Sequence, residues 1–408
     1  MTGKTEPFVV VVGAGPAGLL LALLLARSGI PVQILDKSTT LDDQPRATHY
    51  SPPAVYELRR AGVLDDVRLQ GFSPGAVAWR KLDGTYLAGL DNTVLGDYED
   101  RMVCLPLNHL GKIIYAHLQR ESLATVSWDH NVVAIGQDEG KAWIDVTTSK
   151  DSKPRRLSAP YIVGCDGANS QIRRALFGDW EFPGTTWDQQ LVATNTYYDF
   201  SRFGWKDANF IIDPEHFYMA ARISNDGLWR VTYGESGGLT REELLERQPG
   251  KFRQILPGHP EPSDYKIVSI SPYRVHQRLA ESMRVGRFLL AADAAHLCNP
   301  FGGLGLTGGL VDVGGLFDCL KGIFDGRADD SILDKYSEIR RTKYETVVNP
   351  ISSENIIRLF GANPDTVLQE DKFLQMCLKA ENDPQLSREI QQGVNDLQHD
   401  FTQYYQKK

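Results

Sequence analysis

Residues 8–18 have the sequence Phe8-Val9-Val10-Val11-Val12-Gly13-Ala14-Gly15-Pro16-Ala17-Gly18, an apolar run that ends in closely spaced glycines. The β-branched run has the length of a buried strand, and the glycines interrupt it where a membrane helix or a signal peptide would continue. The apolar segment 19–28 predicts a helix that ends at Gly29, and a second predicted strand, 32–35, leads into Asp36. This order of strand, glycine turn, helix, strand and acid is typical of a nucleotide-binding βαβ unit.

The spacing of the glycines has a physical cause. Gly13 allows a tight turn, Gly15 lets the backbone approach a pyrophosphate, and Gly18 lets the helix pack closely on the strand. The start of the helix directs free N–H groups and a positive dipole end toward the phosphates. The carboxylate of Asp36 is placed to bond a ribose hydroxyl. FAD and NAD use the same unit, so these residues predict a dinucleotide without choosing between the two.

Length and composition exclude several classes of protein. The 408 residues are enough for two to three domains of roughly 150 residues, and the net charge of −8 has the wrong sign for binding nucleic acid backbones. The five cysteines are scattered without Cys-x-x-Cys spacing, which argues against a disulfide framework. No His and Cys cluster has metal-ligand spacing. We therefore expect a cytoplasmic protein without a metal, a membrane span or a nucleic acid partner.

Two further segments repeat the pattern of an apolar strand that runs into an aspartate. Residues 161–170, Tyr161-Ile162-Val163-Gly164-Cys165-Asp166-Gly167-Ala168-Asn169-Ser170, end in an Asp-Gly turn before a basic helix start. Residues 286–296 run into Asp293, and the glycine-rich loop 300–306 precedes another apolar helix. Carboxylates at strand ends lie where open α/β sheets bind ligands, and free N–H groups at a helix start can stabilise negative charge.

These three segments, in this order, resemble the GxGxxG, DG and GD motifs of the single-component (class A) flavoprotein monooxygenases, the family of para-hydroxybenzoate hydroxylase. The resemblance extends from Phe8 to about residue 360. It implies non-covalently bound FAD, reduction by NADH or NADPH, and hydroxylation of a phenolic or other electron-rich aromatic molecule with O2 through a C4a-hydroperoxyflavin. Members of this family are often dimers, so the resemblance also implies a homodimer.

The resemblance implies a set of site residues as well. Asp293 is expected to bind the ribityl chain of FAD, and Asp166 with Gly167 to serve the flavin site and nicotinamide docking. Arg46 matches an arginine that helps govern flavin movement, and Pro300 matches a proline beside the reacting face of the flavin. The expected cofactor-binding set is Gly13, Ala14, Gly15, Pro16, Ala17, Gly18, Asp36, Lys37, Arg46, Ala47, Val132, Asp166, Gly167, Asp293, Pro300, Gly303, Gly305, Leu306 and Thr307.

Polar residues of the second domain are candidates for contact with the substrate. A His or Tyr near a phenol oxygen can accept its proton, and an Arg can hold a phenolate. Alternation with period two places His216 and Tyr218 on one face of a predicted strand and the residues between them on the other. We select His216 and Tyr218, together with Arg46 and Pro300, as catalytic residues. Further candidates are Tyr197, Arg222, Trp229, Arg230, Tyr233, His276 and Arg278.

The predicted fold class is α/β (α+β), with a Rossmann-like FAD-binding domain interleaved with an antiparallel β-sheet substrate domain and followed by C-terminal helices. We expect a discontinuous FAD-binding domain of 8–75, 101–180 and 284–360, a substrate domain of 76–100 and 181–283, and a C-terminal helical segment of 361–408.

Individual elements of these domains are predicted as well. The substrate domain is expected to hold a hairpin around Asp83-Gly84 and strands at 190–198, 209–212, 217–223 and 228–234. Helices are expected at 241–253 and at 331–348, the second ended by Asn349-Pro350.

Some residues depart from the family pattern. Ala292 stands in place of the usual glycine of the third motif, and Leu304, Thr307 and Leu107 replace polar residues near the expected FAD site. Two alternatives stay open beside the hydroxylase. One is another FAD oxidoreductase of the same fold, a double-bond reductase or an epoxidase, which substrate-coupled oxygen consumption would distinguish. The other is a catalytically decayed FAD-binding relative, whose flavin would bleach little with NAD(P)H and candidate phenols.

Overall fold

The computed structural model describes residues 6–406 of the chain. Its first sheet has the strand order β17-β18-β11-β1-β2-β7, and every pairing in it is parallel except that of β17 with β18. Because β1, β11 and β18 are neighbours that run in one direction, the three motif turns that follow them lie side by side. The strands are β1 (Val9–Val12), β2 (Val32–Leu35), β7 (Ala124–Ser127), β11 (Tyr161–Gly164), β17 (Arg284–Val285) and β18 (Phe288–Leu290).

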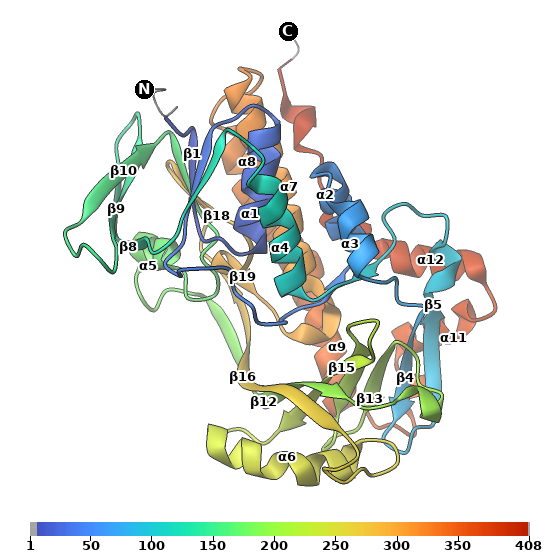
Figure 1. Cartoon of the computed structure of the whole chain (residues 1–408). Helices are drawn as coiled ribbons and strands as arrows, with labels where there is room; N and C mark the ends of the chain where they lie inside the picture. Colours follow the sequence, from blue (N-terminus) through green and yellow to red (C-terminus); the bar gives the residue numbers. More distant parts are fainter. Residues whose placement is uncertain (1–5, 407–408) are drawn as a thin grey trace.

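Helices cover one face of this sheet (Figure 1). Helix α1 (Pro16–Arg27) is apolar on all sides because it packs between the sheet, α4 (Leu107–Leu118) and α7 (Leu304–Phe324), and its residues 18–26 are all buried. A small sheet lies beside β11 and α5 (Gln171–Phe177). It consists of β8 (Asn131–Gln137), β9 (Ala142–Thr147) and β10 (Arg155–Ala159).

A larger sheet has the order β19-β16-β12-β15-β14-β13-β4-β5. The predicted hairpin around Asp83-Gly84 is present as β4 and β5, but β13 pairs with β4 in parallel, so the sheet is mixed rather than wholly antiparallel. A tight turn forces antiparallel pairing only between consecutive strands, and β4 and β13 are far apart in the chain. The strands are β4 (Ala76–Lys81), β5 (Tyr86–Asp91), β12 (Gly184–Tyr197), β13 (Ala208–Ile212), β14 (Tyr218–Arg222), β15 (Leu228–Glu235), β16 (Lys266–Leu279) and β19 (His296–Leu297).

The two faces of the larger sheet have different partners. Helix α6 (Arg241–Ile255) lies along the face that points away from the first sheet (Figure 1), where Tyr218 shares an apolar cluster with Phe252. The opposite face packs against α9 (Asn349–Gly361) and α11 (Lys372–Ala380), and Phe217 there shares a cluster with Phe301. The side chains along β14 therefore alternate as the sequence predicts, and only the face of Phe217 and Phe301 is continuous with the loop of the third motif.

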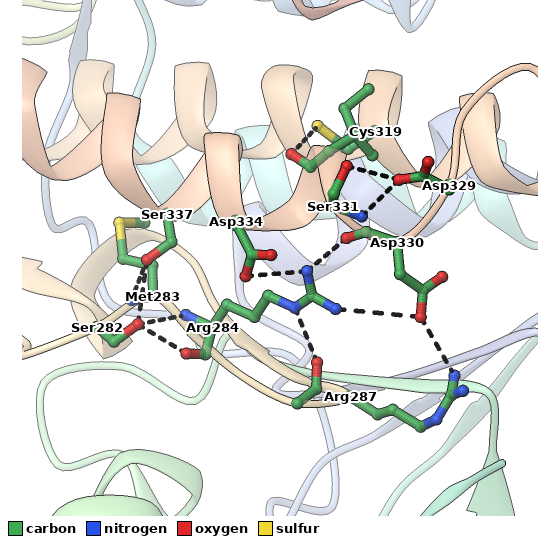
Figure 2. Close-up of polar contacts among 12 residues, drawn as sticks. Ser282, Met283, Arg284, Arg287, Cys319, Asp329, Asp330, Ser331, Asp334 and Ser337 are labelled. Carbon is green, nitrogen blue, oxygen red and sulfur yellow. Dashed lines mark hydrogen bonds and ion pairs between the residues drawn. The ribbon is translucent and has the colours of Figure 1, made fainter. Parts of the chain in front are cut away.

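A helix that follows α7 anchors the edge of the first sheet. Figure 2 shows Arg284 of β17 reaching the start of α8 (Ile332–Lys343), with an ion pair to Asp334 at 3.0 Å, while Ser337 accepts the backbone N–H of Met283 at 2.9 Å. The predicted helix end at Asn349-Pro350 is wrong. A π-helical turn, Tyr344–Val348, follows α8, and Pro350 then falls in the first turn of α9, where its missing N–H is not needed.

Short elements join the two sheets. The chain passes from β2 through β3 (His49–Tyr50), α2 (Pro52–Arg60) and α3 (Leu64–Gln70) to β4, and β6 (Val103–Cys104) pairs with β3. Helices α10 (Val367–Glu370) and α12 (Pro384–Gln392) flank α11. Among residues 6–406, no helix is long and apolar enough to cross a membrane.

Candidate functional site

The glycine turn after β1 has the close contacts that its spacing predicts. A Cβ on Gly13, at φ +109°, would lie 2.4 Å from the carbonyl oxygen of Cys165, and one on Gly18 would lie 2.0 Å from the carbonyl oxygen of Gly13. A Cβ on Gly15 would meet nothing within 4 Å, so the backbone is open there. No side chain caps the start of α1 at Gly15, which leaves N–H groups of its first turn free for phosphate oxygens.

Asp36 supports this turn from the end of β2. Its carboxylate accepts the backbone N–H of Ala14 and that of Ser38, each at 2.7 Å. A carboxylate can accept about four hydrogen bonds, so Asp36 keeps capacity for a ribose hydroxyl. The neighbouring Lys37 is exposed.

Asp166, after β11, is hydrogen-bonded by the helix that follows it. Its carboxylate accepts the hydroxyl of Ser170 at 2.5 Å and the backbone N–H groups of Gln171 and Ile172 at 2.7 and 3.2 Å. Burial raises the pKa of Asp166, and these hydrogen bonds oppose the rise. Gly167 has φ +78°, and a Cβ there would meet nothing within 4 Å, so the Asp-Gly turn has an open side.

Asp293, after β18, has a different environment. Within residues 6–406 its carboxylate accepts no hydrogen bond and forms no ion pair. The side chain is accessible to water but is surrounded by protein, and this burial raises its pKa against the pull of His296 and Arg46. An acidic group without a protein partner at a strand end suits a ligand that brings hydroxyl donors.

The loop before α7 also has features that suit a flavin. Pro300 begins a 3-10 turn, Gly303 follows at φ +63°, and no side chain caps the start of α7 at Leu304. Gly305 and Leu306 lie in the first turn of α7, and Thr307 is fully buried, with its hydroxyl 3.4 Å from the backbone N of Ser51. The residues of the three motifs thus combine free N–H groups, an open glycine surface and an unpaired carboxylate, which fit the phosphates and polyol chain of FAD.

Three further residues belong to the expected cofactor-binding set: Arg46 and Ala47 lie in the loop before β3, and Val132 lies in β8. Arg46 is exposed and pairs with Asp42 at 3.0 Å, and the carbonyl of Ala47 accepts the backbone N–H of Leu107 at 3.0 Å. The side chain of Val132 is buried in the main core cluster and 5% exposed, so only its backbone is available to a cofactor.

The structure does not bring His216 and Tyr218 together with Pro300 and Arg46. Tyr218 is fully buried in the cluster on the α6 face, and Nδ1 of His216 lies 3.2 Å from Nζ of Lys251, a residue of α6. Both side chains are therefore on the side of the larger sheet that faces away from the third motif. The side chains alternate between the two faces as predicted. The choice of the face of His216 and Tyr218 for catalysis is corrected, because α6 packs against that face and covers it.

The sequence reasoning missed a polar corner between the Arg46 loop and the larger sheet, which we define as His49, Asn195 and Arg230. Arg230 donates from Nε to Asn195 Oδ1 at 3.0 Å, and from its terminal nitrogens to the carbonyl oxygens of Pro45 and Arg46. Nδ1 of His49 lies 2.8 Å from the hydroxyl of Thr48, whereas Nε2 is buried without a partner in the described residues. Burial and the nearby Arg230 lower the pKa of His49 to about 4, so its ring is neutral.

Only part of this corner has a signal in the sequence. Arg230 is one of the polar candidates, and His49 follows the Arg46 segment directly. Nothing in the local pattern brings residues 49, 195 and 230 together. Strand pairing places Asn195 opposite Arg230, and the hydrogen bonds of Arg230 to the carbonyl oxygens of Pro45 and Arg46 bring in the segment before His49. No group of three or more His, Cys, Asp or Glu side chains in residues 6–406 is arranged to hold a metal ion.

Comparison with known proteins gives a consistent result. A family model described as "FAD binding domain" matches residues 6–350. The chain is 38% identical over 374 residues to para-nitrophenol 4-monooxygenase from Pseudomonas sp. (strain WBC-3), covering 91% of this chain and 92% of that protein. It is 36% identical over 359 residues to 6-hydroxy-3-succinoylpyridine 3-monooxygenase HspB from Pseudomonas putida (strain DSM 28022 / S16), covering 87% and 90%.

Comparison with solved structures also finds monooxygenases. The crystal structure of p-nitrophenol 4-monooxygenase PnpA from Pseudomonas putida DLL-E4 matches with a TM-score of 0.90 and 36% identity, covering 97% of this chain and 98% of that one. The flavin-dependent monooxygenase PieE, in complex with FAD and substrate, has the same fold at a TM-score of 0.77 and 21% identity. The predicted fold class, the FAD cofactor with NAD(P)H as reductant, and the class A resemblance are confirmed. The chain therefore belongs to the FAD binding domain family and is one of its FAD-dependent aromatic monooxygenases.

Proposed function

We propose that this chain hydroxylates a small phenol or hydroxypyridine, which it binds by its ring hydroxyl at the polar corner of His49, Asn195 and Arg230. The observation that carries the proposal is the buried, unpartnered Nε2 atom of a half-buried, neutral His49 beside an arginine. A buried polar atom without a partner costs about 1–3 kcal/mol, and the O–H of a phenol would satisfy it. The relatives named for nitrophenol and hydroxypyridine oxidation support this substrate class.

His49 would act as the acceptor of the phenolic proton, because the negative charge of the phenolate that forms beside it would oppose the lowering of its pKa by burial and Arg230. With Nδ1–H donated to the hydroxyl of Thr48, Nε2 carries the free lone pair. Arg230 forms no ion pair within residues 6–406, so its charge is available to stabilise the phenolate that forms. Loss of the proton makes the ring richer in electrons, which favours attack by an electrophilic oxygen. Bound FAD, once reduced by NAD(P)H, would supply that oxygen from O2.

The cofactor contacts expected from the sequence are part of this proposal. The glycine turn and the start of α1 would hold the pyrophosphate, Asp36 the ribose, Asp293 the ribityl chain, and the start of α7 the polar edge of the flavin ring. Pro300 and Arg46 would border the ring, and Asp166 with Gly167 would serve nicotinamide docking. The open Gly15 backbone and the unpaired Asp293 carboxylate support these assignments.

Domain division, assembly and location are proposed as well. The division into 8–75, 101–180 and 284–360, with a substrate domain of 76–100 and 181–283 and a C-terminal segment of 361–408, is supported by the first sheet, whose strands come from those three segments. Five free cysteines support a cytoplasmic location. The homodimer rests on family resemblance, and light scattering of the purified protein tests it.

A panel of phenols and hydroxypyridines tests the function. Purified FAD-loaded enzyme should oxidise NAD(P)H and consume O2 faster with the right compound and release a hydroxylated product. Neither product nor stimulated oxidation across the panel would refute the hydroxylase and favour a decayed relative, and substrate turnover without oxygen uptake would indicate a reductase.

Two histidine variants then test the position of the substrate. His49→Ala should lower kcat by about 10²-fold, the usual contribution of a positioned base. His216→Ala is the matched control on the α6 face and should leave kcat unchanged. The reverse pattern would restore His216 as the catalytic residue.

A further inference from the structure

The third motif turn rests on a buried carboxylate in the middle of α7. Asp312 is fully buried, and its Oδ2 accepts the backbone N–H of Ala292 at 3.1 Å. The same oxygen lies 2.7 Å from Nε2 of His296, which donates to it because a carboxylate only accepts. Residues 292 and 296 flank Asp293, so one carboxylate holds both ends of the turn that presents it.

Charge balance explains how this carboxylate can stay ionised in the core. Nε of Arg340 donates to Oδ1 of Asp312 at 2.7 Å, and Arg340 also donates to the carbonyl oxygen of Leu397. Burial alone would raise the pKa of Asp312, but His296 and Arg340 outweigh it and the net shift is downward. The oxygen that Ala292 and His296 share therefore remains an acceptor.

The turn requires these hydrogen bonds to Asp312 because the backbone of the turn is strained at Ala292. Ala292 has φ +57°, a left-handed conformation that disfavours a residue with a Cβ by about 1–2 kcal/mol. A Cβ on Gly309 would lie 2.7 Å from the Cβ of Ala292, so the turn sits directly against α7, one turn before Asp312. Without the hydrogen bond to Ala292, relaxation of this backbone would move Asp293.

We propose that Asp312 is a positioning residue for cofactor binding, which, with His296 and Arg340, fixes the turn so that Asp293 meets the ribityl chain of FAD. This inference rests on the proposed role of Asp293. Asp312 contacts the turn from the side of α7 and does not itself contact the cofactor.

A matched pair of variants in α7 tests the inference. Asp318 lies in the same helix and pairs with Arg60 at 2.5 Å, but no hydrogen bond joins it to the motif turn in the described residues. Asp312→Asn should weaken FAD binding to the apoprotein by about tenfold, the value of one hydrogen bond to a charged group. Asp318→Asn should leave the FAD dissociation constant within about twofold, whatever it does to the thermal midpoint. Flavin fluorescence gives the dissociation constants, and thermal unfolding of the apoprotein gives the midpoints.

A double-mutant cycle separates positioning from general destabilisation. If Asp312 acts through Asp293, Asp312→Asn should weaken FAD binding much less in an Asp293→Asn background than in the wild type. Additive losses, or equal losses for Asp312→Asn and Asp318→Asn, would overturn the inference. If Asp312→Asn does not fold, His296→Gln, which alters the other end of the turn, takes its place in the same cycle. Wild-type affinity in Asp293→Asn alone would instead refute the proposed role of Asp293.

Discussion

The turns after β11 and β18 lie next to each other in one parallel sheet, and each begins with an aspartate, yet the two carboxylates differ in every contact. Asp166 accepts three hydrogen bonds from residues 170–172 at the start of α5. Asp293 accepts none from residues 6–406 and stays accessible to water. The same local pattern therefore supports two tasks: Asp166 fixes a helix start, and Asp293 is left free for a ligand.

The difference arises from the segment on the C-terminal side of each turn. A helix begins five residues after Asp166 and brings its free N–H groups to the carboxylate. After Asp293 the chain forms a short 3-10 turn and β19, and the next helix start, at Leu304, lies beyond a glycine loop. Stability and ligand binding can thus be tested separately at two equivalent places of one fold.

The largest effect on stability is expected at the turn after β11. Asp166→Ala removes the acceptor of three hydrogen bonds at a partly buried site, and the free energy of unfolding of the apoprotein should fall by about 3 kcal/mol. Urea denaturation followed by circular dichroism measures it. A loss below about 1 kcal/mol would mean that the contacts at α5 do not stabilise the fold.

The buried carboxylate of Glu57, in α2, extends the comparison to pH. Burial raises the pKa of Glu57 from 4.5 to about 8, Arg60 opposes the rise, and Asp318 adds to it. Between these values the folded chain holds a proton that the unfolded chain has released, so stability is full below pH 4.5 and is lost as the pH rises toward 8. Glu57→Gln should therefore flatten the fall of the thermal midpoint between about pH 4.5 and 8, where the Glu57 proton contributes a loss of up to about 1.4 kcal/mol per pH unit. If the thermal midpoint of Glu57→Gln depends on pH as that of the wild type does, the raised pKa of Glu57 is contradicted.

The smallest effect is expected from exchanging the turn residues themselves. Ala292→Gly relieves a left-handed alanine but adds freedom to the unfolded chain, so the apoprotein should gain at most about 1 kcal/mol. Gly167→Ala, at φ +78° in the neighbouring turn, should lose about 1 kcal/mol or slightly more. Thermal unfolding of both variants measures the pair, and a loss of stability in Ala292→Gly would show that the turn is not strained.

The sequence was most informative where local spacing alone sets the geometry. The glycines at 13, 15 and 18 and the strands that end in Asp36, Asp166 and Asp293 predict the first sheet and its ligand edge. Alternation along β14 predicts two faces, but only tertiary packing decides which face α6 covers, so His216 and Tyr218 could not be placed. The parallel pairing of β13 with β4 and the meeting of His49 with Arg230 also depend on contacts between distant segments.

Binding of FAD by Asp293→Ala tests the central claim most directly. The account predicts that this variant, purified without added cofactor, retains almost no FAD, while its apoprotein unfolds at a temperature no lower than that of the wild type, because no protein contact is lost. The apoprotein of Asp166→Ala, by contrast, should unfold at a lower temperature than that of the wild type. If Asp293→Ala retains FAD at the wild-type occupancy, the carboxylate is not reserved for the cofactor, and the distinction between the two turns is wrong.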